Sequence, residues 1–339
     1  MSNRNIHLIC RLIRPENVIS LLLSGSSQQP DKLALFLSRI QIERFTRLHS
    51  LSFSDVKDET LDKVLRHVNT NALRSLSLFS SSLVTQHTMD LISSILAKNS
   101  LRKLHFDTDF ATIDQISWPA QCTLEQITIN ECNDQQILTI LRQSRYLRTL
   151  SLKNVDLRKI DQTLLADSFD QLVSLTLDCR NTSMGMLETF LSLTPSITHF
   201  GLNCLDFSGD CLRRFSECES FIQNKLPRLN TFTFSIQCSD YDYDDIEYLL
   251  LPFRTEFWLK QKRWFITCKY TINSSKRSVK LQSSSISEFD FADGYEGKVI
   301  MCASCTKTSK AEPVIKSTWS VHMNFAEIVN YIAWNSVSS

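Results

Sequence analysis

A short pattern of apolar residues, Leu-x-x-Leu-x-Leu or a looser apolar version of it, recurs along the first two thirds of this chain. Its nine copies begin at Val18, Leu48, Leu73, Leu101, Leu124, Leu147, Leu172, Ile197 and Leu229. Successive copies lie 23 to 32 residues apart, and most of these intervals fall within the spacing of about 20–29 residues typical of leucine-rich repeats. One copy arises easily by chance in an apolar chain, whereas nine in near-register indicate a repeated structural unit.

Each unit combines a strand pattern with a helix pattern. The last two apolar residues of the phrase lie two positions apart, so they point to one face of a strand. Most phrases are followed by apolar residues spaced to share one face of a helix. These sets are Leu33, Phe36, Leu37 and Ile40; Leu61, Val64, Leu65 and Val68; Leu91, Ile92, Ile95 and Leu96; Ile137, Leu138 and Leu141; and Leu187, Phe190 and Leu191. One unit cannot bury its own apolar face, so the units must stack to share a core.

The alternation of strand and helix predicts an α/β fold, namely a leucine-rich-repeat solenoid (horseshoe) with strands inside and helices outside. Residues 1–240 are expected to hold the array of about nine repeats. A stricter repeat consensus has Asn or Cys at its ninth position, and Cys132 alone meets it among repeats two to nine. We therefore expect the usual capping ladder of such repeats to be replaced or absent.

Residues 241–339 lack the phrase and follow a different pattern. In the run 263–272, Trp264, Ile266 and Cys268 alternate with mainly polar residues, as in a half-buried strand. Further strand candidates are Ser278–Gln282, Lys298–Ala303 and Thr318–Phe325. We predict that they form a small C-terminal antiparallel β-rich cap over the open edge of the last repeat. Ligand recognition by this region is the alternative.

Charge and hydropathy limit the classes of partner and the cellular location that we expect. Lys plus Arg number 37 against 36 for Asp plus Glu, so the sustained positive field used by nucleic-acid-binding or membrane-surface proteins is missing. No stretch approaches the roughly 18 consecutive apolar residues of a transmembrane helix, and the start does not look like a secretory signal. We expect an intracellular protein, cytoplasmic or nuclear, with no nucleic-acid partner and no membrane partner.

The side chains that usually carry chemistry do not form a known motif here. The eleven Cys are scattered, which favours small buried thiols in a reducing compartment. Cys302 and Cys305 form a lone Cys-x-x-Cys pair, whereas a structural zinc site usually needs two such pairs. The six Gly form no phosphate-binding loop, and the seven His are dispersed. We expect no catalytic residue, no metal, no cofactor and no enzymatic activity.

The inner strand face is the remaining candidate surface. Most of its positions hold small hydroxyl residues, for which β propensity and close strand packing are a sufficient structural explanation. The central repeats are more varied, and aromatic residues are the usual anchors of interfaces. The candidate partner-binding residues are Phe79, Lys103, His105, Asp107, Gln126, Asn130 and Lys153.

The chain resembles the F-box and leucine-rich-repeat-like protein family in the runs 14–21, 40–53 and, most specifically, Pro252–Phe265. The resemblance implies an N-terminal F-box that docks onto a cullin-type ubiquitin ligase, while the repeats select the substrate. Seventeen residues precede Val18, so we expect no F-box in this chain, and cullin-type subunits as partners only if an F-box is supplied.

These patterns together predict a non-enzymatic protein–protein recognition module, and the resemblance implies that it is the substrate-binding part of an F-box-type ubiquitin ligase adaptor. The alternative is a repeat scaffold protein with no ubiquitin link, which engages its partner through the C-terminal region or the helical side. An enzyme is the third and weakest hypothesis, because no group of residues meets the usual requirements of an active site.

Overall fold

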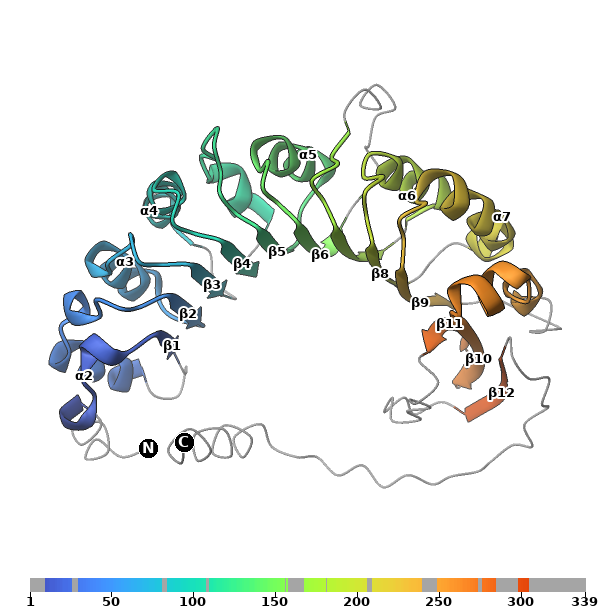
Figure 1. Cartoon of the computed structure of the whole chain (residues 1–339). Coiled ribbons are helices and arrows are strands. Elements are labelled where there is room, and N and C mark those ends of the chain that lie inside the picture. The colour runs from blue at the N-terminus through green and yellow to red at the C-terminus, as the bar shows by residue number, and fades with distance from the viewer. Residues whose placement is uncertain are drawn as a thin grey trace.

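The computed structural model shows one curved sheet of twelve strands. It describes residues 10–25, 30–80, 84–107, 110–155, 157, 168–180, 182–205, 209–239, 249–273, 276–284 and 298–304. Figure 1 shows the strands along the inner side of an arch and the helices along its outer side. Strands β1 to β9 follow one another in chain order, and β11, β10 and β12 complete the sheet.

Strands β1 to β9 are parallel, and most of their described connections contain a helix. The strands are β1 (Ser20–Ser24), β2 (Ser50–Ser54), β3 (Ser75–Phe79), β4 (Lys103–Asp107), β5 (Gln126–Asn130), β6 (Thr149–Val155), β7 (Ser174–Arg180), β8 (His199–Leu205) and β9 (Thr231–Ser239). The connecting helices are α2 (Pro30–Arg39), α3 (Asp58–His67), α4 (Gln86–Ala97), α5 (Asp134–Gln143), α6 (Met184–Ser192) and α7 (Gly209–Lys225), with the 3₁₀ helix η3 (Phe110–Gln115) between β4 and β5. Helices α2 to α6 confirm the five helical patterns of the sequence.

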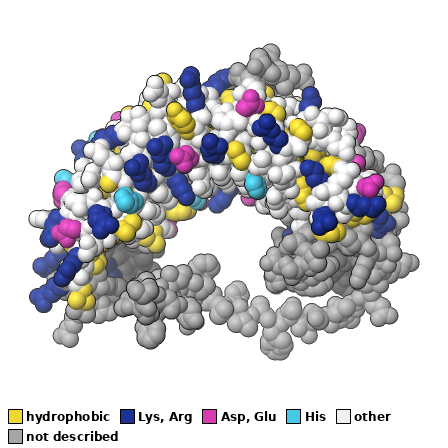
Figure 2. Space-filling view, in the orientation of Figure 1, with side chains coloured by type: hydrophobic (Ala, Val, Ile, Leu, Met, Phe, Trp, Pro, Cys, Tyr) yellow, Lys and Arg dark blue, Asp and Glu magenta, His cyan; other side chains and the backbone are white. Residues whose placement is uncertain are grey.

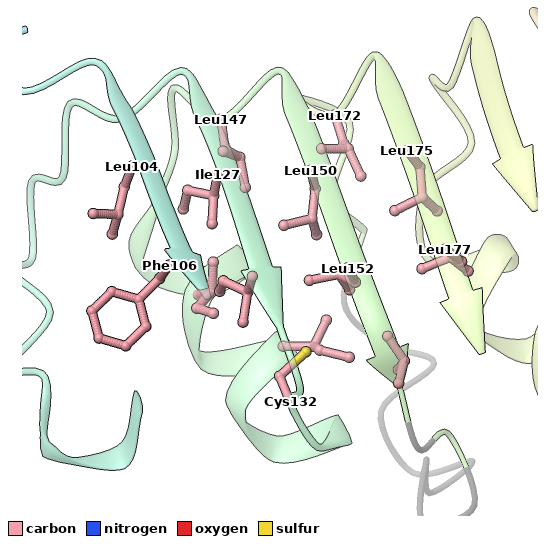
Figure 3. Close-up of a cluster of buried hydrophobic side chains, with 14 of the residues drawn as sticks. Leu104, Phe106, Ile127, Cys132, Leu147, Leu150, Leu152, Leu172, Leu175 and Leu177 are labelled. Atoms are coloured by element: carbon pink, nitrogen blue, oxygen red, sulfur yellow. The ribbon is translucent and has the colours of Figure 1, made fainter. Parts of the chain in front are cut away.

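The parallel strands are aligned so that the apolar phrase of one strand meets that of the next. Leu104 pairs with Ile127, Ile127 with Leu150, and Leu150 with Leu175. Figure 3 shows these side chains in a row on the covered face of the sheet, where each is at most 2% exposed. Burying one such side chain contributes roughly 1.5–3 kcal/mol before conformational entropy is subtracted. Two residues that pair across neighbouring strands are therefore separated in the sequence by the spacing of the phrase.

A row of backbone hydrogen bonds fixes where the parallel strands begin. The Arg74 carbonyl accepts the N–H of Arg102 at 2.8 Å and the N–H of Lys103 at 2.9 Å. A carbonyl that accepts two backbone N–H groups recurs in the same way from unit to unit. We call the residues that provide these carbonyls the edge ladder. Its members are Ile19, His49, Arg74, Arg102, Glu125, Arg148, Val173 and Thr198.

Two neighbouring strands are also joined covalently. Cys179 of β7 and Cys204 of β8 are register partners, and they form a disulfide. The expectation that the cysteines are buried free thiols is therefore wrong for this pair, because the parallel register brings together two residues that are 25 positions apart in sequence. Among the described residues, Cys10, Cys122, Cys132 and Cys218 are free thiols.

The C-terminal strands run antiparallel and belong to the same sheet. Strand β11 (Lys276–Ser284) pairs with β9, and β10 (Phe265–Asn273) lies between β11 and β12 (Lys298–Ser304). They confirm three of the four predicted strands, while 318–325 lies outside the described residues. The turn η5 (Leu251–Phe253) and the π-helix η6 (Phe257–Lys262) precede β10.

The α/β class is confirmed, but the predicted leucine-rich-repeat solenoid (horseshoe) with a small antiparallel cap is wrong. The described strands form a single, mostly parallel sheet, and β9 is hydrogen-bonded to β11, so the C-terminal strands extend the sheet. The connections are also unequal, ranging from the 17-residue helix α7 to the six-residue η3. The phrase specifies which face of a strand is buried, but it does not specify what pairs with the edge of the last strand. The division of the chain at residue 240 stays a prediction.

Candidate partner-binding face

The seven candidate residues lie on four neighbouring strands in the middle of the arch. Phe79 ends β3, three candidates lie on β4, two on β5, and Lys153 lies on β6. Along β3, β4 and β5 the side chains alternate between buried and accessible positions. All seven candidates occupy accessible or half-buried positions, so the alternation predicted from the sequence places them on the uncovered face.

Four of the candidates form one row across the strands. Phe79 pairs with Asp107, Asp107 with Asn130, and Asn130 with Lys153. Since adjacent strands are about 4.8 Å apart, the row extends over roughly 14 Å. We call these four residues the inner row. It presents an aromatic ring, a carboxylate, an amide and an ammonium group in that order.

The other three candidates lie beside the inner row. Lys103 and Gln126 pair with each other at the starts of β4 and β5. His105 lies between these positions and the inner row on β4, and its ring centroid is 4.4 Å from that of Phe79. The structure therefore brings Phe79 and His105 into direct contact, although they are far apart in sequence.

The surroundings of His105 shift the pKa of its imidazole. Burial lowers the pKa of His105, and the positive charge of Lys153 lowers it further, whereas Asp107 acts in the opposite direction. The Nε2 atom of His105 is buried and has no hydrogen-bond partner among the described residues. An unpaired buried polar atom costs free energy, so the position of this ring is maintained by its packing and not by a hydrogen bond from Nε2.

Asn154 is a supporting residue that the sequence reasoning missed. Its Nδ2 donates a hydrogen bond to Oδ1 of Asn130 at 3.0 Å, which holds the side chain of the inner row in place. Asn154 has a φ of 49°, in the left-handed region that Asn tolerates better than most residues. An Asn two positions after the last leucine of a phrase is the signal that could have identified it.

A second concavity lies where the strands begin. This hollow has a volume of about 520 Å³, and its lining includes Glu125, Arg145, Tyr146, Arg148 and Arg228. Sequence reasoning missed it because it considered the residues within the strands and not those of the turns that lead into them.

Burial also changes the chemistry of a cysteine near this face. Burial raises the pKa of Cys132 to about 12, so its thiol stays protonated and unreactive at neutral pH. Among the described residues, no group of three or more His, Cys, Asp or Glu is arranged to hold a metal ion. Cys305 of the Cys-x-x-Cys pair lies outside the described residues. The helices that the structure describes include none long and apolar enough to cross a membrane.

Neither the protein-family models nor the curated proteins that were searched gave a match to this chain. The resemblance to the F-box and leucine-rich-repeat-like family therefore stays a prediction.

Proposed function

We propose that this protein is a non-enzymatic recognition protein, which binds a protein partner on the inner face of its curved sheet. The observation that carries the proposal is the inner row together with the contact between Phe79 and His105. Polar, charged and aromatic groups alternate over about 14 Å of a rigid sheet, which suits recognition of an extended surface.

Each member of this face has a role in the proposed complex. Phe79 is the apolar anchor, because aromatic residues contribute most to binding at the centres of interfaces. Asp107 and Lys153, two strands apart, favour a partner with a basic group followed by an acidic one, because charge order sets specificity. His105 supports the anchor, because its ring packs against that of Phe79.

The resemblance to the F-box and leucine-rich-repeat-like family adds a finer proposal. The partner would be a substrate of a cullin-type ubiquitin ligase, to which the protein is linked when an F-box is supplied. A scaffold with no ubiquitin link is the alternative, and the proteins recovered with the chain distinguish the two.

Affinity capture from a cell lysate followed by mass spectrometry tests the proposal. The double variant Phe79→Ala with Lys153→Glu should reduce recovery of the partner at least tenfold, since an anchor residue typically contributes 2 kcal/mol or more. Lys63→Glu, an exposed change on α3, is the matched control and should leave recovery unchanged. Equal recovery with the inner-face variant and the wild type would contradict binding on this face.

The same experiment separates the two finer proposals. Recovery of cullin-type ligase subunits with the chain as given supports the ubiquitin link. Recovery of other proteins alone, under the same conditions, supports the scaffold.

An intracellular location, in cytoplasm or nucleus, belongs to the same proposal. In a reducing compartment disulfides rarely persist, so the Cys179–Cys204 bond is the feature most sensitive to location. If the location is intracellular, non-reducing peptide mapping of the protein from its native compartment should find this bond reduced in most molecules. An intact disulfide there would favour an oxidising compartment.

A further inference from the structure

We propose that the hollow at the start of the central strands is a second binding site, and that its occupant is an acidic segment of a protein partner. The proposal concerns a different surface from the inner row and does not depend on it. It rests on the construction of the hollow, on the pairing of its charged groups and on an exposed aromatic ring.

Four equivalent turns build the hollow. They lead into β6, β7, β8 and β9, and in each the N–H of the first apolar residue of the phrase donates to the carbonyl three positions earlier. The donors are Leu147 (3.1 Å), Leu172 (3.2 Å), Ile197 (3.3 Å) and Leu229 (3.0 Å). Because the same turn recurs on adjacent strands, the side chains of these turns surround a single hollow of about 520 Å³. A site of this size accepts several residues of an extended peptide, as its volume lies in the usual range of binding pockets.

The arginines of the edge ladder fall into two groups. Arg74 donates from Nη1 to the Ser100 carbonyl at 3.2 Å, and Arg102 donates in the same way to the Thr123 carbonyl at 3.1 Å. Both side chains therefore hold the turn of the next unit in place. Arg148 occupies the equivalent ladder position, but its guanidinium makes no hydrogen bond or ion pair with any residue that the structure describes.

Arg145 and Arg228 share this property, so three guanidinium groups without a described partner line the same hollow. All three side chains are exposed. Guanidinium groups bind carboxylates through paired, charge-assisted hydrogen bonds. The hollow therefore offers several donors to an anionic group.

The two carboxylates in the lining are already engaged. Glu125 lies 3.7 Å from the guanidinium of Arg102, and Asp170 accepts a hydrogen bond from the Ser168 hydroxyl at 2.9 Å. The hydroxyl leaves the negative charge of Asp170 in place, but the three guanidinium groups outnumber it, so the net charge of the hollow is positive. Figure 2 shows Lys and Arg side chains spread along the middle of the arch, with few Asp and Glu side chains between them.

An exposed aromatic ring favours a peptide over a free anion. Tyr146 is 60% exposed and follows Arg145 in the turn before β6. Tyr and Arg are the residue types most enriched at the energetic centres of protein interfaces. A polyphosphate chain is a poorer fit, since it has no side chain to pack on the exposed ring of Tyr146, and the protein as a whole carries a net charge of only +1.

Fluorescence anisotropy with a fluorescein-labelled peptide of eight glutamates tests the site in the full-length protein. Wild type should bind the peptide, and raising the salt concentration should weaken binding. The double variant Arg148→Gln with Arg228→Gln should lose at least tenfold in affinity, because each charge-assisted bond contributes that order of magnitude. Arg180→Gln at the opposite end of β7 is the matched control and should change affinity less than twofold. The far-ultraviolet circular dichroism of each variant checks that it is folded.

Further variants and a second probe test the role of Tyr146 and the nature of the occupant. Tyr146→Ala should weaken peptide binding, Tyr146→Phe should restore most of it, and Phe79→Ala on the inner row should leave it unchanged. The proposal is overturned if the wild type fails to bind the peptide, or if the double arginine variant binds it equally well. It is also overturned if a labelled single-stranded oligonucleotide of eight nucleotides binds more tightly than the peptide with the same arginine dependence, since the occupant would then be a nucleic acid.

Discussion

The parallel strands β1 to β9 and the antiparallel strands β10 to β12 belong to one sheet, yet their cores are built differently. Between parallel strands, aliphatic side chains occupy equivalent register positions, as Leu150 and Leu175 do. At the C-terminal end, the core is aromatic. Trp258 of η6 is fully buried and lies 5.0 Å from the ring of Phe253 and 6.5 Å from that of Phe232 in β9.

The difference follows from how each region is connected. A parallel strand needs a long crossover, so each unit repeats the same strand and covering segment. The segment between β9 and β10 instead passes over a strand, because β11 lies between them in the sheet, and it contributes large rings of irregular spacing. The regular region gains stability from many similar contacts, whereas the C-terminal region depends on a few large ones.

The largest expected effect is at the aromatic core. Trp258→Ala should lower the free energy of unfolding by about 3–5 kcal/mol, because it leaves a large cavity. Trp258→Phe should cost much less, since it keeps most ring contacts and removes an indole N–H that has no hydrogen-bond partner among the described residues. Urea unfolding followed by circular dichroism measures both. Equal losses for the two variants would show that ring packing does not hold this region together.

Leu150→Ala makes the corresponding test in the parallel region. Leu150 is fully buried in the row of aligned aliphatic residues, so the variant should lose about 2–4 kcal/mol. The matched control is Ser151→Ala, the next residue on the opposite face of the same strand, which should change stability by less than about 0.5 kcal/mol. A similar loss for both would contradict the division of β6 into a buried and an open face.

The rate at which a buried thiol reacts shows how readily its region opens, so two cysteines compare the two regions within one molecule. Cys132, after β5, and Cys268, in β10, are both fully buried, so alkylation of either requires local opening. We expect Cys268 to be alkylated faster, because elements near the end of a structure open at a lower free-energy cost than central ones. Mass spectrometry after timed exposure of the native protein to iodoacetamide measures both rates. A faster reaction at Cys132 would reverse the order of stability proposed here.

The smallest effect concerns His105 on the inner face. Its pKa in the folded protein lies below the ordinary value of 6.5, so the unfolded chain takes up the proton first as the pH falls. The stability that depends on neutral His105 is complete above about pH 6.5 and is lost as the pH falls through the folded pKa. Lys153→Met should raise the pKa of His105 and Asp107→Asn should lower it, as measured by NMR titration of the imidazole. Opposite shifts would contradict the charge arrangement of the inner row.

The sequence was informative wherever side chains alternate at a fixed period. The leucine phrase located the nine parallel strands and their buried face, and the same alternation placed Phe79 and Lys153 on the open face. It did not place them in one row, because that requires the register of β3 to β6. It also gave no sign of the antiparallel pairing between β9 and β11, since hydrogen bonds between backbones leave little trace in side-chain patterns.

The hollow shows a different limit of sequence reasoning. Arg74, Arg102 and Arg148 occupy the same position relative to the leucine phrase, yet the first two bind a neighbouring carbonyl and the third does not. This distinction depends on the geometry of the next turn. A pattern of residue types alone cannot express it.

The edge ladder has a consequence for how such a chain can change in length. Each of the strands β2 to β9 begins where its backbone donates to the edge-ladder carbonyl just before the preceding strand. The register of each strand pair is therefore set separately. Extra or missing residues in a crossover are therefore absorbed on the outer surface before the ladder is reached. An added residue between the ladder and the strand would instead slip the alignment by one position and turn the leucines outward. The chain thus tolerates insertions and deletions in its helical connections, but not between the edge ladder and the start of a strand.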